Sequence, residues 1–545
     1  MNTSLLKYLS FILLIATAST LPISISAQAK YFIGFTDKQN STYSVDKPNE
    51  FLSARAIERR QKQGIAITTD DLPVSSYYIN QVAQIATTIH YPLRWFNGVI
   101  ATLTPQQLTA IQELSFVKSV TKIFEPTKSL TDEVTEWQPL SQIDKNVFAN
   151  LNYGASYTQV AMMNGHILHG NGYFGDGMVI AVLDAGFLNA NTHSAFDSLW
   201  QKGRILGTRD FVNPQSDIYK EHYHGTMVLS TMGGYVDGNL IGTAPRAKYW
   251  LIRTEDAATE QIIEEYNWAA GAEFADSAGA DIINSSLGYT TFDVVGQNHA
   301  YQDLNGNTAL VTLAANMAAS KGLVVVVSAG NDGNSPWHYI SVPADSPYVL
   351  TVGAVDNKKM KADFSSFGST ADGRIKPDVC AMGKGTVLAN ATGSIYTSNG
   401  TSFSSPLMAG MVACLWQAKP TLTAQQIIEL IKSSSSNYSS PDNSIGFGIP
   451  DFALASKSNI AVLPKTMELW PNPFTSKINV NVSKPNTKVT IWVCNANGQI
   501  LFSKNLISNG TGLVEAELPV DLPKGVYIIS LSTAETTYYV MGIKQ

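Results

Sequence analysis

The sequence predicts an α/β protein: a parallel sheet with helices on both faces, preceded by a small α/β unit and followed by an all-β sandwich. The central sheet is indicated by three nearly continuous β-branched runs, 178–183, 323–327 and 348–352, which helical patterns separate. Strands buried on both faces of a parallel sheet have this composition. The sandwich is indicated by short alternating runs near the C-terminus. A chain of 545 residues has room for about three or four such units.

The N-terminus has the pattern of a secretory signal. A basic residue precedes an apolar run, 9–21, which ends at Pro22 and is followed by small residues. The run is too short for a membrane span, so residues 1–27 are predicted to be a signal peptide, cleaved after Ala27 or Ala29. A buried N-terminal helix is the alternative, which the proline disfavours. No later stretch is apolar for long enough to cross a bilayer, so we expect no transmembrane segment in the mature chain.

Residues 30–126 are predicted to form the small α/β unit. Its expected elements are two strands and two helices, at 31–35, 98–103, 51–63 and 105–114. The polar stretch that follows, 125–142, has no clear periodicity and is predicted to be a linker. We therefore assign residues 28–150 to this unit and its linker, and residues 151–458 to the central α/β domain.

The C-terminal region, 466–545, changes to the period of two that is typical of strands with one buried face. Asn497-Gly498 is a favoured two-residue hairpin turn. The expected strands lie at 477–482, 489–493, 500–502, 514–518, 526–531 and 538–543. This density of short strands predicts a compact antiparallel sandwich.

Charge and cysteine content exclude several classes of protein. The net charge is −6 and there is no basic run, which argues against nucleic acid as a partner. The three cysteines, Cys380, Cys414 and Cys494, are too few and too widely spaced for a disulfide framework or a metal cluster. A single disulfide stays open. Cys414 falls in an apolar helical stretch and is interpreted as a small buried hydrophobe.

Three residues form a candidate acyl-transfer triad. Asp184 ends the first buried run, His224 lies in His-Gly-Thr-Met-Val, and Ser402 lies in Gly-Thr-Ser-Phe-Ser-Ser-Pro. The order Asp, His, Ser is one of three unrelated orders in which this triad occurs. His224 would take the proton of the Ser402 hydroxyl, and Asp184 would orient the imidazole. His222 is close by but lacks the Gly-Thr context.

The neighbouring sequence fits these roles. Ser402 opens a helical pattern, which would place its hydroxyl beside free backbone amides, with Pro406 tolerated near the first turn. His224 also opens a helical run, in which Gly225 would allow close packing beside the sheet. Asn331 follows the second buried run and is the candidate oxyanion donor, together with the Ser402 N–H.

The central domain resembles the subtilisin-like serine peptidases. The segments that carry the resemblance are 182–186, 224–228, 242–247, 283–288, 328–331, 376–379 and 400–406. The family usually has Ser or Thr after the catalytic Asp, where this chain has Ala185, and often Met-Ala where it has Phe403 and Ser404. The resemblance implies a subtilisin-like fold. It also implies that Ser286, Leu287 and Gly288 form one wall of a substrate cleft and pair with the substrate backbone.

Both flanks have resemblances of their own. Residues 30–126 are similar to the propeptide that such peptidases carry as chaperone and inhibitor. The C-terminal region resembles the type IX secretion sorting domain of Bacteroidetes, through segments 469–474, 497–498 and 522–527. These resemblances imply a zymogen that the type IX secretion machinery recognises. It would be secreted or held at the cell surface, by way of the periplasm of a Gram-negative bacterium.

One segment, Asp303 to Asn307, resembles the start of a calcium loop. Its twelfth position is Ala314 instead of the closing Glu, so a plain turn rich in Asx and Gly is the alternative. We assign no metal ligands and expect no required cofactor. Calcium as a structural ion is left open.

The sequence thus predicts a secreted serine endopeptidase that acts on protein and peptide substrates. One rival is a binding or adhesion module on a catalytically silent peptidase scaffold. The presence of Asp184, His224, Asn331 and Ser402 argues against it. Another rival is a serine esterase, which would have Gly-x-Ser-x-Gly and the order Ser, Asp, His; the chain has neither.

Overall fold

The computed structural model describes residues 29–125, 138–139, 147–148, 151–458 and 469–544, the last range without 472, 482–485, 496–499, 510–512 and 533–536. The predicted signal peptide, most of the predicted linker, Asn472 and Asn497-Gly498 lie outside the described residues. Contacts divide the chain into two compact units, 1–457 and 458–545. In the part described, no helix is both long and apolar enough to cross a membrane.

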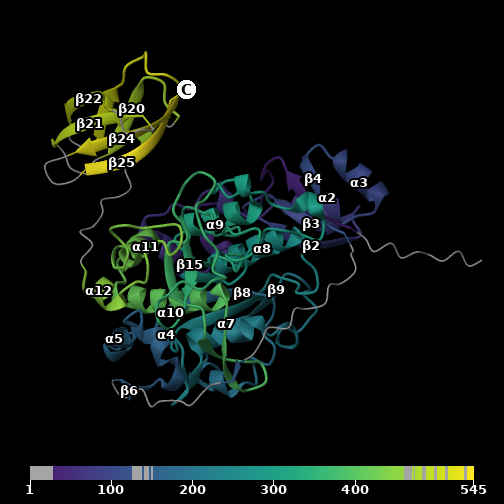
Figure 1. Cartoon of the computed structure of the whole chain (residues 1–545). Helices are drawn as coiled ribbons and strands as arrows, with labels where there is room; N and C mark the ends of the chain where they lie inside the picture. The colour runs from purple at the N-terminus through teal and green to yellow at the C-terminus, as the bar shows by residue number, and fades with distance from the viewer. Residues whose placement is uncertain are drawn as a thin grey trace, which may run out of the picture. The chain divides into compact units, whose positions relative to one another are not determined.

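A seven-stranded sheet forms the centre of the first unit (Figure 1). Every neighbouring pair of its strands is parallel, which confirms the predicted parallel sheet. In order across the sheet the strands are β16 (Val379–Met382), β15 (Leu350–Val355), β14 (Val324–Ser328), β13 (Ile282–Ser285), β8 (Val179–Asp184), β12 (Lys248–Arg253) and β9 (Ile205–Asp210).

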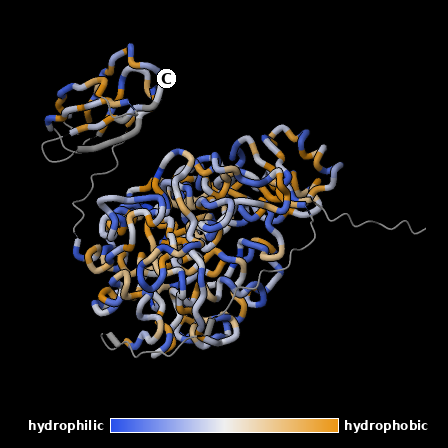
Figure 2. The backbone as a smooth tube through the Cα atoms, viewed as in Figure 1, coloured by the Kyte–Doolittle hydropathy of each residue, from blue (hydrophilic) through white to orange (hydrophobic). Residues whose placement is uncertain are grey.

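Helices cover both faces of this sheet, as predicted. Helices α7 (His224–Gly233) and α10 (Thr401–Ala418) pack together on one face, and α8 (Ile263–Ala278) and α9 (Leu310–Ser320) on the other (Figure 1). Apolar residues concentrate in the interior of this unit (Figure 2), and the central sheet strands are among the buried residues. Because both faces are covered, the five strands from β16 to β8 are buried along their whole length. The edge strand β9 is partly exposed.

The remaining elements of the domain lie around this core. Its shorter helices are α4 (Tyr157–Ala161), α5 (Gly165–Gly170), α6 (Asp197–Gln201), α11 (Ala424–Ser433) and α12 (Phe452–Lys457). Its short strands are β5 (Gln138–Pro139), β6 (Val147–Phe148), β7 (Leu151–Asn152), β10 (Tyr235–Val236), β11 (Leu240–Ile241), β17 (Thr386–Ala389) and β18 (Ile395–Ser398). Strand β5 pairs with β18, so a two-residue piece of the predicted linker joins a sheet of the domain.

The N-terminal part of the first unit is an antiparallel sheet with helices, which confirms the predicted α/β unit. Its strands are β2 (Thr88–Leu93), β3 (Gly98–Thr102), β1 (Lys30–Phe35) and β4 (Val117–Phe124), in that order, and its helices are α1 (Ala54–Gln63), α2 (Ser76–Ala83) and α3 (Pro105–Gln112). One sheet face shares a core with α8, in which Phe32 and Tyr266 pack at 5.3 Å between ring centroids.

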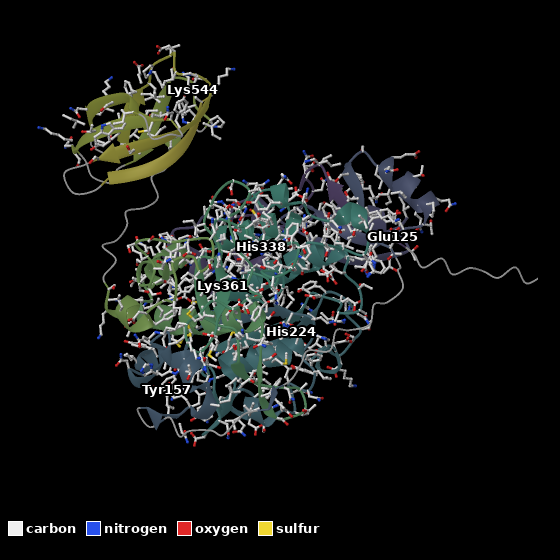
Figure 3. All side chains as sticks on the ribbon, in the orientation of Figure 1. Glu125, Tyr157, His224, His338, Lys361 and Lys544 are labelled. Carbon is white, nitrogen blue, oxygen red and sulfur yellow. The ribbon has the colours of Figure 1, made fainter. Side chains whose placement is uncertain are left out.

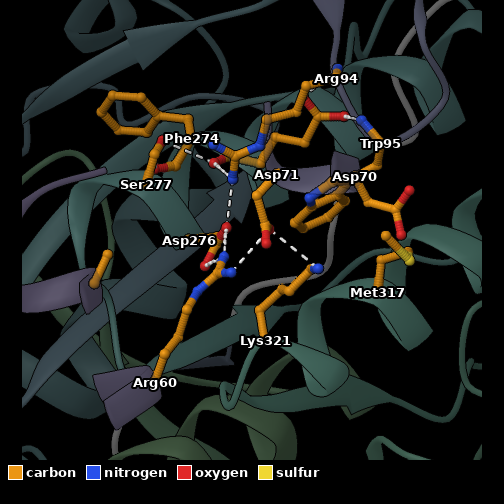
Figure 4. Close-up of polar contacts among 12 residues, drawn as sticks. Arg60, Asp70, Asp71, Arg94, Trp95, Phe274, Asp276, Ser277, Met317 and Lys321 are labelled. Carbon is orange, nitrogen blue, oxygen red and sulfur yellow. Dashed lines mark hydrogen bonds and ion pairs between the residues drawn. The ribbon is translucent and has the colours of Figure 1, made fainter. Parts of the chain in front are cut away.

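A buried charge network joins this N-terminal part to α8 (Figure 4). The Asp276 carboxylate of α8 forms ion pairs with Arg59, Arg60 and Arg94. Close by, the Glu273 carboxylate accepts hydrogen bonds from the backbone N–H of Arg94 at 2.8 Å and of Trp95 at 3.0 Å. The C-terminal half of α8 therefore has cationic partners for its buried Asp276.

The second unit consists of two antiparallel sheets around one apolar core, which confirms an antiparallel β domain. One sheet contains β19 (Leu469–Trp470), β20 (Lys477–Asn481) and β23 (Leu513–Glu517). The other contains β22 (Ile500–Ile507), β21 (Lys488–Cys494), β24 (Gly525–Ser532) and β25 (Thr537–Lys544). Strand β19 was not among the strands expected from the sequence.

The three cysteines are free thiols, and Cys380 and Cys414 are buried. Cys414 is fully enclosed in α10, as its apolar context predicted. Burial raises the pKa of the Cys380 thiol to about 12, so this group is uncharged and inert at neutral pH.

Candidate active site

Asp184 is the last residue of β8, at the edge where the carboxyl ends of the parallel strands meet. Its side chain is completely buried. Carboxylate Oδ1 accepts hydrogen bonds from the Ala185 N–H and from His224 Nδ1, both at 2.8 Å. Oδ2 has no hydrogen-bond partner among the described residues. Asp184 therefore holds the His224 ring by one nitrogen.

His224 opens α7, as predicted, and its side chain is 21% exposed (Figure 3). Gly225 lets this helix end approach the sheet, since a Cβ there would lie 2.4 Å from the Gly186 carbonyl oxygen. Burial alone would lower the pKa of His224, but the charges of Asp184 and Glu255 outweigh it and raise that pKa above its usual value. The geometry suits an imidazole that accepts a proton at Nε2.

Ser402 is the second residue of α10. Its hydroxyl lies 3.4 Å from the Ser286 carbonyl oxygen, and no hydrogen bond to His224 is formed among the described residues. His224, Asn331 and Ser402 nevertheless line one cavity of about 330 Å³. Hydrogen bonds between a catalytic serine and its base are often long without substrate and shorten in the complex.

Pro406 lies deeper in its helix than the sequence suggested. It is the sixth residue of α10, inside the helix and beyond its first turn. A proline has no N–H, so the Ser402 carbonyl four residues earlier loses its partner in the helix. The Ser286 hydroxyl donates to that carbonyl at 2.9 Å. This bond compensates for the proline and fixes the backbone of Ser402.

Asn331 follows β14 and reaches the same cavity. Its Oδ1 atom accepts from the Thr401 N–H at 2.9 Å and from Thr401 Oγ1 at 3.0 Å. The amide oxygen is thus occupied, which leaves the Nδ2 group as the donor. The Ser402 N–H lies in the first turn of α10, where helix amides have no acceptor within the helix.

Ser286, Leu287 and Gly288 follow β13 and also line the cavity. Gly288 lies exposed beside Ser341, and a Cβ there would come within 2.0 Å of Ser341 Oγ. The structure thus gathers all the residues singled out from the sequence: six line the cavity, and Asp184 lies beneath it against His224.

Two glutamates of the cavity were missed by the sequence analysis. Glu255 and Glu260 line it together with His224 and Ser402. Glu255 could have been found, because it comes two residues after the apolar strand β12 and so lies at the same sheet edge as Asp184. Glu260 lies in a loop with no comparable signal.

In the segment Asp303 to Asn307, which resembles the start of a calcium loop, side chains accept hydrogen bonds from nearby backbone N–H groups. Asp303 Oδ2 accepts from the Ala300 N–H at 2.8 Å, and Asn305 Oδ1 accepts from the Asn307 N–H at 2.9 Å. Within the described residues, no cluster of three or more His, Cys, Asp or Glu side chains is arranged to hold a metal ion. Whether calcium binds here stays a prediction.

Comparison with known families places three regions of the chain. The profile of the subtilase family matches residues 175–448, about half of the chain. A peptidase S8 propeptide domain of Bacteroidota matches residues 30–138. A secretion system C-terminal sorting domain matches residues 468–544.

Two sequence relatives agree with the first match. The chain is 30% identical over 280 residues to subtilisin NAT of Bacillus subtilis subsp. natto, which covers 51% of this chain and 65% of that protein. It is 28% identical over 380 residues to serine protease AprX of Bacillus subtilis strain 168, and this alignment covers 64% of this chain and 76% of that protein. Among solved structures it is similar to MycP1 from Mycobacterium smegmatis, with 22% identity, a TM-score of 0.46 and coverage of 61% and 91%.

Proposed function

The chain belongs to the subtilase family, and on this premise we propose that it is a serine endopeptidase that works through an acyl-enzyme on Ser402. One observation carries the proposal. The buried Asp184 carboxylate holds His224 Nδ1 at 2.8 Å, in a ring position that leaves Nε2 free to act in the cavity shared with Ser402 and Asn331.

In the first half of the reaction, Ser402 Oγ attacks the carbonyl carbon of the substrate peptide. Its proton passes to His224 Nε2, and Asp184 stabilises the imidazolium that forms. The raised pKa of His224 fits this role, because the Asp184 charge favours the protonated ring. His224 then gives the proton to the departing amine, the C–N bond breaks, and an ester on Ser402 remains. Water, activated by the same histidine, hydrolyses that ester.

The negative charge of the tetrahedral intermediate needs donors fixed in advance. Asn331 Nδ2 and the Ser402 N–H would bind this oxyanion, because the Asn331 oxygen is already occupied by Thr401. Ser286, Leu287 and Gly288 would form the cleft wall that pairs with the substrate backbone. The scheme needs no cofactor, and calcium is kept only as a candidate structural ion.

We further propose that the enzyme is made as a precursor and cut between residues 125 and 150. The Gln261 side chain supports this, since it donates to the Glu125 carbonyl at 2.7 Å and accepts from the Glu125 N–H at 2.9 Å. Gln261 adjoins the cavity residue Glu260, so the chain leaves the N-terminal unit close to the cleft. N-terminal sequencing of secreted protein that found residue 28 or 30 as the mature start would contradict this cut.

The sorting-domain match indicates a secreted or cell-surface protein. We propose the type IX machinery as the partner in export, after passage through the periplasm. The rival functions remain a catalytically silent binding module and an esterase. Neither is favoured by a specific observation of the site.

Purified mature protein tested on casein and on a short-chain ester separates these functions. We expect hydrolysis of casein, and loss of that hydrolysis by a factor of at least about 10⁴ in Ser402→Ala, as for removal of a triad member. Ser404→Ala, two residues further along the same helix, is the matched control. Full casein hydrolysis by Ser402→Ala would refute the proposed nucleophile, and activity on the ester alone would favour an esterase.

A further inference from the structure

One end of the cavity is strongly acidic. Glu255 and Glu260 line it, and their charges act on Glu264, the second residue of α8. Glu264 itself lines a neighbouring cavity, which Lys30 and Arg253 also line. The three charges act on one another: burial, then the other glutamates, raise the pKa of Glu264 well above its usual value. These three side chains are called the acidic corner below.

No ion pair of the described residues neutralises the acidic corner. Among the described residues, none of its three carboxylates takes part in an ion pair. The nearby Arg253 forms ion pairs with other carboxylates, those of Asp210 at 3.3 Å, Glu221 at 3.3 Å and Asp256 at 3.6 Å. Like charges collected in a partly buried place without a counter-charge are unfavourable, so they point to a partner that arrives from outside.

Two buried polar atoms at the acidic corner lack any partner. Glu264 is 1% exposed; its Oε1 atom accepts from the Asp256 N–H at 3.2 Å, but Oε2 accepts from no described residue. The Tyr289 hydroxyl, also 1% exposed, has no hydrogen bond in the described structure. Burial, then the charges of Glu255, Glu264, Glu260 and Glu265, raise the pKa of Tyr289. Unsatisfied buried groups of this kind are rare in folded proteins.

A helix N-terminus alone does not account for this arrangement. The positive end of α8 stabilises Glu264, as it does acidic residues in the first turn of any helix. It offers nothing to Glu255 and Glu260, which come from the loop before the helix. A metal ion is not favoured either, because no metal-binding arrangement exists within the described ranges.

We propose that the acidic corner binds the basic side chain, Lys or Arg, of a peptide substrate close to its scissile bond. This inference rests on the proposed peptidase function and adds its substrate class. The carboxylates and the Tyr289 hydroxyl accept the hydrogen bonds that an ammonium or guanidinium group donates. Leu287 and Ala257, which line the same cavity, offer apolar surface to the aliphatic stem of that side chain.

The test compares two peptide pools with internally quenched fluorescence, identical except that Arg or Lys in one is replaced by Gln or norleucine in the other. Wild-type enzyme should cleave the basic pool with a kcat/KM at least about tenfold higher, the effect of roughly one charge-assisted hydrogen bond. Measured at about pH 9, where Glu260 carries charge, Glu260→Gln should reduce that ratio by about tenfold. Asp332→Asn removes a charge elsewhere in the cavity, where Ser335 Oγ donates to Asp332 Oδ1, and should keep the ratio.

A second measurement keeps this proposal separate from the peptidase proposal. Binding of a fluorescent Arg peptide and of its Gln counterpart to Ser402→Ala is measured by anisotropy, which needs no turnover. Tighter binding of the Arg peptide that Glu260→Gln weakens supports the acidic corner even if no peptide is cleaved. Equal binding of both peptides, or a preference that Glu260→Gln leaves intact, overturns the proposal.

Discussion

The two ends of α8 carry buried acidic groups that the protein treats in opposite ways. Near its C-terminal end, Asp276 is shared by three arginines of the N-terminal unit, and Glu273 is bound by two backbone N–H groups. At its N-terminal end, Glu264 accepts one hydrogen bond from a backbone N–H and forms no ion pair in the described structure. Glu255 and Glu260 likewise form no ion pair with a described residue. Asp276 and Glu273 thus have partners within the chain, whereas the glutamates of the acidic corner form the proposed site for a basic substrate side chain.

The largest expected effect is on stability, when the ion pairs near the C-terminal end of α8 are broken. Asp276→Ala, made with Ser402→Ala to keep the precursor intact, leaves Arg59, Arg60 and Arg94 without their shared carboxylate. Removal of one partner from a buried ion pair costs about 3–5 kcal/mol, and the free energy of unfolding should fall by that amount. Urea denaturation followed by tryptophan fluorescence measures it.

The matched control for this change lies on α1. Glu58 pairs with Lys62 on the exposed side of that helix, and Glu58→Gln should leave the urea midpoint nearly unchanged. A loss for Asp276→Ala no larger than that of the control would contradict the view that this network secures the N-terminal unit.

The acidic corner, near the N-terminal end of α8, should give a smaller effect: the preference for basic peptides should depend on pH. Burial and neighbouring carboxylates raise the pKa of Glu255 to about 7 and of Glu260 to about 9. Because their pKa values are raised, these two carboxyl groups become negatively charged only as the pH rises through about 7 to 9. The kcat/KM ratio of an Arg peptide to its Gln counterpart should therefore increase several-fold from about pH 6 to about pH 9, where arginine itself stays charged.

Other groups that face the acidic corner set the control for this titration. They are Asp184, His224, Asp256, Asp293 and Tyr289. The titration of His224 affects both peptides alike and cancels in the ratio. Glu260→Gln should flatten the rise, and a ratio that falls with pH, or a rise that this variant leaves unchanged, would contradict the assignment.

Sequence reasoning located the proposed reacting groups because each has a local signature. Asp184 and Asn331 end buried strands, and His224 and Ser402 open helices, so short motifs were sufficient to find them. The parallel sheet could be predicted for the same reason, since burial on both faces leaves continuous apolar runs.

The rest depends on contacts between distant segments, which leave no local pattern. Arg94 and Asp276 are 182 residues apart, and the local sequence around neither residue predicts their contact. The role of Ser286 as donor to the Ser402 carbonyl follows from Pro406, whose depth in α10 the motif did not reveal. Of the acidic corner, Glu255 follows a strand and could have been found from the sequence, whereas the burial of Glu264 became visible only in the structure.

The most direct test of the central claim, that Ser402 is an activated nucleophile, is labelling of the mature protein with a fluorophosphonate and mass mapping of the adduct. We predict one adduct, on the peptide that contains Ser402, and strongly reduced labelling in His224→Ala, because the hydroxyl then loses its base. An adduct on another residue, or equal labelling of His224→Ala, would contradict the account.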